Sequence, residues 1–202
     1  KSINSAGFSI DDVTDVLLNH LHFDHCGGAV AWDSSKEAYD VLFKNANYWS
    51  NEKHWDWATS PNPREKASFL DENLFPIKES GQLKFINNMS KGFNYCEELD
   101  LEIICVDGHT EKQMIPKIKH KGREIVYAAD LIPTAGHIPV PYIMGYDVRP
   151  LITMVEKTDF LNEAYENEYL LFMEHDPHHQ LVSLKKTEKG IRFDKSFSIN
   201  EL

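Results

Sequence analysis

The stretch that decides the fold is His20-Leu21-His22-Phe23-Asp24-His25, which places three imidazoles and one carboxylate within six residues. An extended or turning backbone puts His20 and His22 on the same side of the chain, because side chains two residues apart point the same way. Burying such polar groups without partners is costly, so a purely structural role explains the stretch poorly. Imidazole and carboxylate are ligands that suit Zn²⁺, Mn²⁺ and Fe²⁺. The stretch therefore predicts a metal site.

Apolar stretches precede the other side chains that could bind a metal. We interpret residues 13–18 as a strand that leads into the histidine-rich stretch. Three further strands are predicted to lead into a ligand in the same way: 101–106 into His109, 124–128 into Asp130, and 169–173 into His175. Strand ends on one rim of a sheet converge in space. We therefore expect all four strand ends to contribute to one site.

The rest of the pattern indicates a mixed α/β fold. Lys121-Gly122 separates the apolar stretches 114–120 and 124–128 and is a two-residue hairpin signal. Apolar positions recur near helical spacing over 149–167. Two short strands, 181–186 and 191–193, are predicted to close the chain around a turn. Directly after the first motif, Gly27-Gly28 is expected to let the backbone turn tightly beside the metal loop.

Residues 32–88 differ in character from the rest of the chain, because aromatic residues alternate there with prolines. Pro63 is suited to start a short helix over 64–72. We interpret this segment as an insertion that forms a lid or pocket wall rather than regular core. The insertion would belong to a single domain that spans residues 1–202.

Composition narrows the class of protein. The chain of 202 residues is 42% hydrophobic and carries a formal net charge of −11, so it can build a core but would repel a phosphate backbone. No apolar stretch approaches the ~20 residues that span a bilayer. Cys26, Cys96 and Cys105 are too widely spaced for a thiolate zinc site and are expected to be reduced and at least partly buried. We expect a cytoplasmic protein without nucleic-acid or membrane partners.

The motif His20-Leu21-His22-Phe23-Asp24-His25 resembles the H-x-H-x-D-H signature of the metallo-β-lactamase superfamily. Gly108-His109-Thr110, Ala129-Asp130 and Glu174-His175-Asp176-Pro177 follow in the family's order, so the resemblance covers residues 12 to about 190. Within the superfamily the chain looks most similar to the lactonase and organophosphate-hydrolase-like branch. The resemblance implies a four-layer αββα sandwich, normally with several strands before the motif. Only residues 1–19 precede it here, so we expect the chain to lack those strands.

The resemblance also implies a site that holds two divalent metal ions, with zinc the preferred ion and manganese or iron as alternatives. His20, His22 and His109 would hold one ion; Asp24, His25 and His175 would hold the other; Asp130 would bridge the two. A hydroxide bridging the metals would then cleave an ester, lactone or phosphotriester bond of a small molecule. Asp24 would additionally pass a proton to the leaving group.

Other histidines and tyrosines are weaker candidates. His178 and His179 compete with His175 for the last ligand position, but they lie beyond Pro177 and off the predicted strand. We interpret His137 and Tyr142 as substrate-pocket residues. The lactonases of this branch place a tyrosine three residues after the bridging aspartate, where this chain has a proline, so specificity for acyl-homoserine lactones does not follow. Tyr142 or Tyr146 could substitute for that tyrosine.

Three other functions use the same scaffold. Flavodiiron relatives perform redox chemistry with iron, but they have a glutamate at the position of His22. A non-catalytic metal-binding or interaction protein would bind metal without turning over any ester. Nuclease relatives share the motif, but the acidic charge argues against them.

An incomplete sandwich would also expose a sheet edge, which makes a homodimer a candidate assembly.

Overall fold

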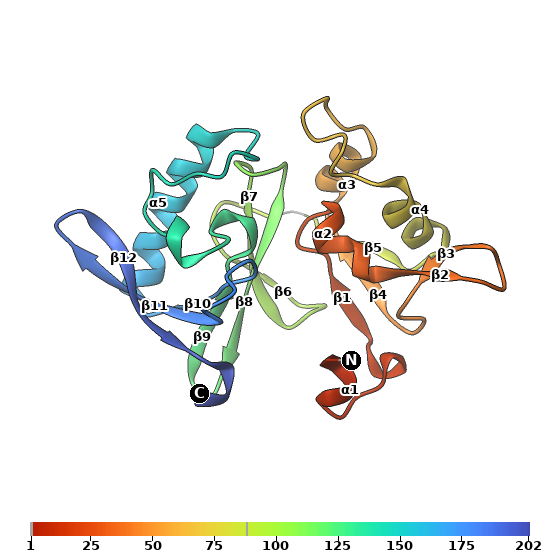
Figure 1. Cartoon of the computed structure of the whole chain (residues 1–202), viewed down its shortest axis with the longest axis horizontal. Helices are drawn as coiled ribbons and strands as arrows, with labels where there is room; N and C mark the ends of the chain where they lie inside the picture. Colours follow the sequence, from red (N-terminus) through yellow and green to blue (C-terminus); the bar gives the residue numbers. More distant parts are fainter. Residues whose placement is uncertain (1, 88) are drawn as a thin grey trace. The chain divides into compact units, whose positions relative to one another are not determined.

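The computed structural model describes residues 2–87 and 89–202, which divide into two compact units, unit 1 (1–88) and unit 2 (89–202). Both units combine helices with β-sheets (Figure 1), which confirms the predicted mixed α/β fold class. Within the described residues, no helix has the length and apolar character needed to cross a bilayer. The single domain over 1–202 stays a prediction.

Unit 1 is built on a parallel three-stranded sheet. The strands, in order across the sheet, are β1 (Asp15–Leu17), β4 (Asn47–Ser50) and β5 (Leu83–Phe85). Strand β1 lies within the predicted stretch 13–18. The other elements are helices α1 (Ser2–Ser5), α2 (Phe23–Cys26), α3 (Glu52–Thr59) and α4 (Asp71–Glu79), the short turns of 3₁₀ helix η1 (Ile10–Asp12) and η2 (Gly27–Ala29), and the hairpin of β2 (Val30–Asp33) and β3 (Ala38–Val41).

The segment 32–88 supplies much of the regular core of unit 1, which differs from the expectation that it lies outside the core. Its aromatic side chains Tyr48, Trp55 and Phe69 are buried in the same apolar cluster as Leu18 and Cys26. Burial of large aromatic side chains is a major source of stability in a small unit. The aromatic composition of this segment is therefore explained by packing, and its role as a lid stays a prediction.

The helix predicted over 64–72 is wrong, because α4 begins only at Asp71. Residues 63–68 form turns instead. The side-chain oxygen of Asn62 accepts hydrogen bonds from the backbone N–H groups of Arg64, at 2.9 Å, and Glu65, at 3.2 Å. Such side-chain-to-backbone bonds compete with helix formation and favour a turn.

Unit 2 is built on a seven-stranded sheet whose order is β12-β11-β10-β9-β8-β7-β6. The strands are β6 (Asn94–Cys96), β7 (Leu101–Val106), β8 (Gln113–His120), β9 (Arg123–Tyr127), β10 (Leu170–Phe172), β11 (Leu181–Thr187) and β12 (Gly190–Phe197). The strands β7, β8 and β9 pair antiparallel in turn, and β10 pairs parallel to β9. The strands β7, β9 and β10 therefore all run in the same direction.

The local signals of unit 2 were largely correct. Strands β8 and β9 form the predicted hairpin, and Lys121 and Gly122 adopt φ values of 49° and 77° that a tight two-residue turn requires. The predicted helix over 149–167 is α5 (Pro150–Glu166), which contributes Phe160, Leu161 and Ala164 to the core of the unit. Two short 3₁₀ turns, η3 (Ala129–Leu131) and η4 (Ala135–His137), lie between β9 and α5, and η5 (Ile199–Glu201) follows β12.

Candidate metal centre

The histidine-rich stretch of unit 1 leaves the C-terminal end of β1 as an irregular loop and then enters the short helix α2. The rings of His20 and His22 lie on the same side of this loop, with centroids 4.7 Å apart, as predicted. The ring centroids of His25 and His20 are 3.9 Å apart. The carboxylate of Asp24 lies 3.5 Å from Nε2 of His25, and its side chain is 44% exposed. This loop and the start of α2 thus bring all four predicted ligands together.

Buried polar contacts fix the shape of this loop. The side-chain oxygen of Asn19 accepts a hydrogen bond from the backbone N–H of His20 at 2.7 Å and lies 3.2 Å from the Nδ1 of the same ring. Between the two histidines, the backbone N–H of Leu21 donates to Nε2 of His54, which lies in α3, at 2.8 Å. The side chain of His54 is fully buried, and its ring nitrogen accepts this hydrogen bond from the backbone. Helix α3 therefore supports the loop through His54, a residue outside the histidine-rich motif.

The glycines after the motif differ from expectation. Gly27 has an ordinary helical φ of −60°, and Gly28 is not among the residues with positive φ; both belong to the 3₁₀ turn η2. The backbone therefore turns at these glycines without the positive φ that only glycine adopts readily. Cys26 is buried in the core and its thiol donates to the backbone oxygen of Leu21. All three cysteines are free, as predicted.

Nitrogen Nε2 of His22 has a carboxylate partner, Glu65. Nε2 of His22 lies 3.3 Å from Oε1 of Glu65, and both side chains are almost completely buried. Glu65 is held in turn by Trp57 and Asn62, whose side-chain N–H groups donate to Oε2 at 2.8 Å and 2.5 Å. A carboxylate on the outer nitrogen of a histidine is the usual way in which proteins orient a metal ligand.

In unit 2 the three predicted ligands follow strand ends, as expected. His109, Asp130 and His175 each come three residues after the last residue of a strand: β7, β9 and β10 respectively. Because these strands run in the same direction, their C-terminal ends lie at the same edge of the sheet. The sequence prediction of converging strand ends is therefore confirmed within this unit.

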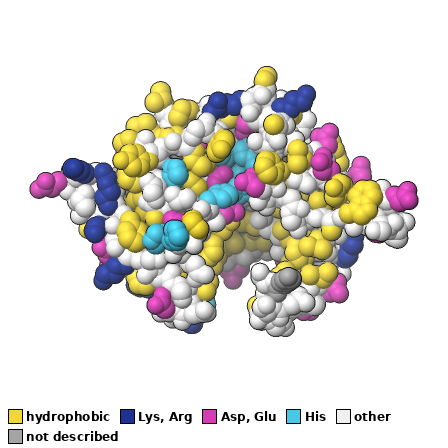
Figure 2. All heavy atoms as spheres, viewed as in Figure 1, with side chains coloured by type: hydrophobic (Ala, Val, Ile, Leu, Met, Phe, Trp, Pro, Cys, Tyr) yellow, Lys and Arg dark blue, Asp and Glu magenta, His cyan; other side chains and the backbone are white. Residues whose placement is uncertain are grey.

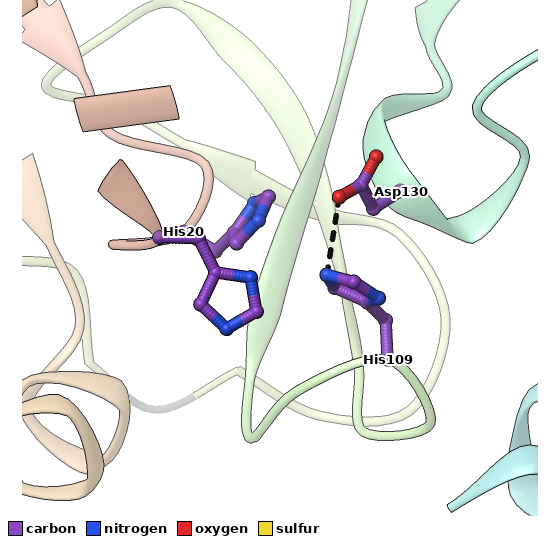
Figure 3. A group of neighbouring side chains, drawn as sticks. His20, His109 and Asp130 are labelled. Atoms are coloured by element: carbon purple, nitrogen blue, oxygen red, sulfur yellow. Dashed lines mark ion pairs between the residues drawn. The ribbon is translucent and has the colours of Figure 1, made fainter. Parts of the chain in front are cut away.

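The carboxylate of Asp130 lies between the two histidines. Its Oδ2 is 3.1 Å from Nε2 of His109, an ion pair that Figure 3 marks, and its Oδ1 is 3.3 Å from Nε2 of His175. Each oxygen of one carboxylate thus contacts a different imidazole. The residue before it, Ala129, has a φ of 42°, a left-handed conformation that costs about 1–2 kcal/mol for a residue with a Cβ. This strained backbone lies directly at the site.

His109 has a second carboxylate on its other nitrogen. Its Nδ1 lies 2.9 Å from Oδ1 of the buried Asp147, whose Oδ2 accepts a hydrogen bond from the hydroxyl of Thr153 at 2.7 Å. Burial disfavours the charged ring, but the hydrogen bonds to Asp130 and Asp147 outweigh it and raise the pKa of His109 to about 9. Two carboxylates at one imidazole create a strongly cation-attracting position.

The loop that carries His109 is clamped against the start of α5. The Glu156 carboxylate accepts hydrogen bonds from the backbone N–H groups of Asp107, at 2.6 Å, and Gly108, at 2.9 Å. A Cβ on Gly108 would lie 2.5 Å from the backbone nitrogen of Thr153. Only glycine allows this approach, because the contacting atoms include the backbone nitrogen and Cα of Thr153, which cannot move away. The glycine before His109 is thus required by packing.

The loop after β10 carries the last predicted ligand. Asp130, Glu174 and His175 each offer a ligand atom, and these atoms lie within 4.8 Å of one another. Burial raises the pKa of Tyr127, and a hydrogen bond to Glu174 raises it further. His179 instead contacts Asp176, at 3.0 Å from its Nδ1. Of the histidines in this loop, His175 is the one for which the structure gives a contact with Asp130.

The proposed pocket residues lie in the loop that follows η3. The Nδ1 of His137 lies 2.8 Å from the hydroxyl of Thr134, and the Tyr142 side chain is exposed. The buried ammonium of Lys157 donates to the backbone oxygens of His137 at 2.6 Å and Tyr142 at 2.8 Å. Burial lowers the pKa of Lys157 to about 8. A lysine of α5 thus holds the loop that carries both residues.

Sequence reasoning missed the supporting residues of both units. These are His54 and Glu65 in unit 1, and Asp147, Glu156 and Glu174 in unit 2. No local motif marks His54, Glu65, Asp147 or Glu156, whereas Glu174 lies inside the Glu174-His175-Asp176-Pro177 motif. The start of α3 could have been predicted from Asn51, a residue type suited to begin a helix, whose side chain accepts a hydrogen bond from the backbone N–H of His54.

The chain belongs to the metallo-β-lactamase superfamily, because the family model matches residues 2–183. This match includes every predicted metal ligand and confirms the resemblance inferred from the H-x-H-x-D-H motif. No sequence match was found among proteins of curated function.

Solved structures with the same fold include a probable metal-dependent hydrolase from Staphylococcus aureus, at 23% identity and a TM-score of 0.79 over 96% of this chain. AidC, a dizinc quorum-quenching lactonase, aligns over 98% of the chain at 23% identity and a TM-score of 0.78. The hydrolase AbOPH of the β-lactamase superfamily aligns over 97% at 18% identity and a TM-score of 0.74. The chain spans 65% of the first of these proteins and 69% of the other two.

Proposed function

We propose that the protein is a hydrolase that cleaves an ester, lactone or related phosphotriester bond of a small molecule at a centre of two divalent metal ions. The observation that carries the proposal is the carboxylate of Asp130, whose two oxygens lie 3.1 Å and 3.3 Å from the Nε2 atoms of His109 and His175. A carboxylate shared in this way suits two cations, because its negative charge offsets their mutual repulsion.

The donor set in each unit fits divalent metal ions of the zinc type. Unit 1 offers His20, His22, Asp24 and His25 from one loop, and unit 2 offers His109, Asp130 and His175 from one sheet edge. In the proposed assignment, His20, His22 and His109 hold the first ion, and Asp24, His25 and His175 the second. All are imidazoles or carboxylates, the ligands of Zn²⁺, Mn²⁺ and Fe²⁺. Zinc is the proposed ion, and the dizinc centre named for AidC supports it.

Bound divalent ions would supply a nucleophilic water at neutral pH and would polarise the carbonyl or phosphoryl oxygen of the substrate. The chain's own residues would prepare the site for this chemistry. Asp147 contacts Nδ1 of His109. Asn19 and His54 accept hydrogen bonds from the backbone N–H groups of His20 and Leu21, respectively, and so fix the backbone there. Pre-organised ligands of this kind reduce the reorganisation needed during the reaction.

Asp24 is the proposed proton donor to the leaving group. Its side chain is 44% exposed, and its carboxylate is within 3.5 Å of His25. A carboxyl that both faces solvent and lies beside the ligands can exchange a proton during turnover. His137 and Tyr142 are proposed to contact the substrate, held by their backbone contacts with Lys157.

The charge of the chain favours a small molecule over a nucleic acid as substrate. The formal net charge is −11, and the Lys and Arg side chains are scattered in small groups on the face shown in Figure 2. Binding a phosphate backbone requires a concentrated set of basic side chains. Lactonases solved with products bound, such as AidC with N-hexanoyl-L-homoserine, support a small-molecule substrate.

The test is an activity panel of lactones, aryl esters, thioesters and phosphotriesters on the zinc-loaded full-length protein, with Asp24→Asn measured beside it. We expect turnover of at least one class by the wild type, and a loss of about 100-fold or more in Asp24→Asn with at least one metal ion retained. Unchanged turnover in Asp24→Asn would exclude the proton-donor role. Bound metal without turnover of any substrate would favour a metal-binding protein that does not catalyse hydrolysis.

A further inference from the structure

A buried carboxylate of unit 1, Glu65, has no place in the ligand set described above. Glu65 is only 2% exposed, although it lies in a turn between α3 and α4 and not in a helix or strand. Burying a carboxylate is costly unless hydrogen bonds and a partner compensate for the loss of water. A glutamate retained at such a position therefore calls for a specific role.

The chain around Glu65 is arranged to hold its carboxylate in one orientation. Asn62 closes the turn by accepting from the backbone N–H of Glu65 at 3.2 Å, and its side-chain N–H donates to Oε2 at 2.5 Å. The indole N–H of Trp57, from α3, donates to the same oxygen at 2.8 Å. Donors on Oε2 fix the carboxylate, so that the other oxygen, Oε1, is presented to His22.

The consequence for His22 is a defined protonation pattern. Oε1 of Glu65 is 3.3 Å from Nε2 of His22, and a carboxylate accepts hydrogen bonds, so it favours the imidazole tautomer that carries the proton on Nε2. The lone pair is then on Nδ1, the nitrogen available for a metal ion. The neighbouring ring of Phe69, with its centroid 4.8 Å away, further limits the orientation of His22.

We propose that Glu65 is a positioning residue of the metal centre, which holds His22 in the tautomer and orientation that bind the metal through Nδ1. The inference rests on the proposed function, because it assumes that His22 is a metal ligand. Asp147 has the corresponding relation to His109 in unit 2, at 2.9 Å from its Nδ1. Outer carboxylates of this kind typically change metal affinity by about 10–100-fold.

The first test measures zinc affinity of the full-length protein by competition with a chromophoric chelator. Glu65→Gln keeps the size of the side chain but removes its charge and one acceptor, so we expect zinc affinity to fall by about 10–100-fold. Glu72→Gln is the matched control, because Glu72 is an exposed residue at the start of α4 and should leave the affinity unchanged. Glu65→Asp, which retains the charge, should recover part of the loss.

The second test does not depend on bound metal. In ¹⁵N NMR spectra of the metal-free protein at a pH where His22 is neutral, we expect its Nε2 to carry the proton in the wild type. In Glu65→Gln the amide oxygen should take the position of Oε2, where Trp57 and Asn62 donate, so the amide N–H group faces His22 and the tautomer protonated on Nδ1 should gain population. Equal zinc affinity in the wild type and Glu65→Gln, or a wild-type His22 protonated on Nδ1, would overturn the inference. Failure of the wild type to bind zinc would instead refute the proposed metal centre, while the NMR result would still decide the role of Glu65.

Discussion

The two units position their candidate ligands in different ways. Unit 1 offers four from six consecutive residues of a loop and the short helix that follows it, whereas unit 2 offers three from the ends of three strands that lie far apart in the sequence. A loop needs support from outside to keep its shape, and His54 and Glu65 provide it from α3 and the turn after it. A sheet edge is already rigid, so unit 2 needs mainly a clamp on the one loop that carries His109. The difference shows that a contiguous motif can propose ligands but does not reveal the residues that hold them.

The largest expected effect comes from comparing two glycines near the candidate ligands: Gly108, before His109 in unit 2, and Gly28, after His25 in unit 1. In Gly108→Ala the new Cβ would lie 2.5 Å from the backbone nitrogen of Thr153, so we expect a loss of about 3 kcal/mol in the free energy of unfolding. In Gly28→Ala the new Cβ meets no described atom within 4 Å, and we expect a change of less than about 0.5 kcal/mol.

Urea denaturation of both metal-free variants measures the contrast. The two substitutions add the same methyl group beside a metal-ligand loop, so any difference between them comes from the local packing. If Gly108→Ala were as stable as Gly28→Ala, the close approach of α5 to the His109 loop would not exist in solution.

A smaller effect sharpens the comparison of the two outer carboxylates. Asp147→Asn should weaken zinc binding by about 10–100-fold, because the neutral amide is a poorer acceptor for Nδ1 of His109. We expect the loss to be at least as large as in Glu65→Gln, since the contact of Asp147 is shorter, 2.9 Å against 3.3 Å. Asp159→Asn, at an exposed position of α5, serves as the control. Zinc binding by Asp147→Asn equal to that of Asp159→Asn would remove Asp147 from the site.

The sequence allowed the candidate metal ligands to be proposed because their signals are local. His20 to His25 form one motif, and His109, Asp130 and His175 each follow a recognisable apolar stretch, three residues after the strand end. The hairpin at Lys121-Gly122 and the helix α5 were predictable for the same reason, since turn residues and helical spacing act over a few residues.

The supporting residues could not be predicted, because their partners are distant in the sequence. His54 lies 33 residues from Leu21, Glu65 lies 43 residues from His22, and Asp147 lies 38 residues from His109. Only the folded chain brings these pairs together. Strands β4 and β5 were missed because each is only three or four residues long within a segment whose aromatic residues suggested a lid.

The central proposal is that the chain binds two metal ions and that Asp130 bridges them. The most direct test is the number of zinc ions per chain, measured by elemental analysis after dialysis of the full-length wild type and Asp130→Ala. We predict two ions per chain in the wild type. In Asp130→Ala we predict less than one, because the carboxylate that offsets the repulsion between the cations is missing. Two zinc ions retained by Asp130→Ala would contradict the account.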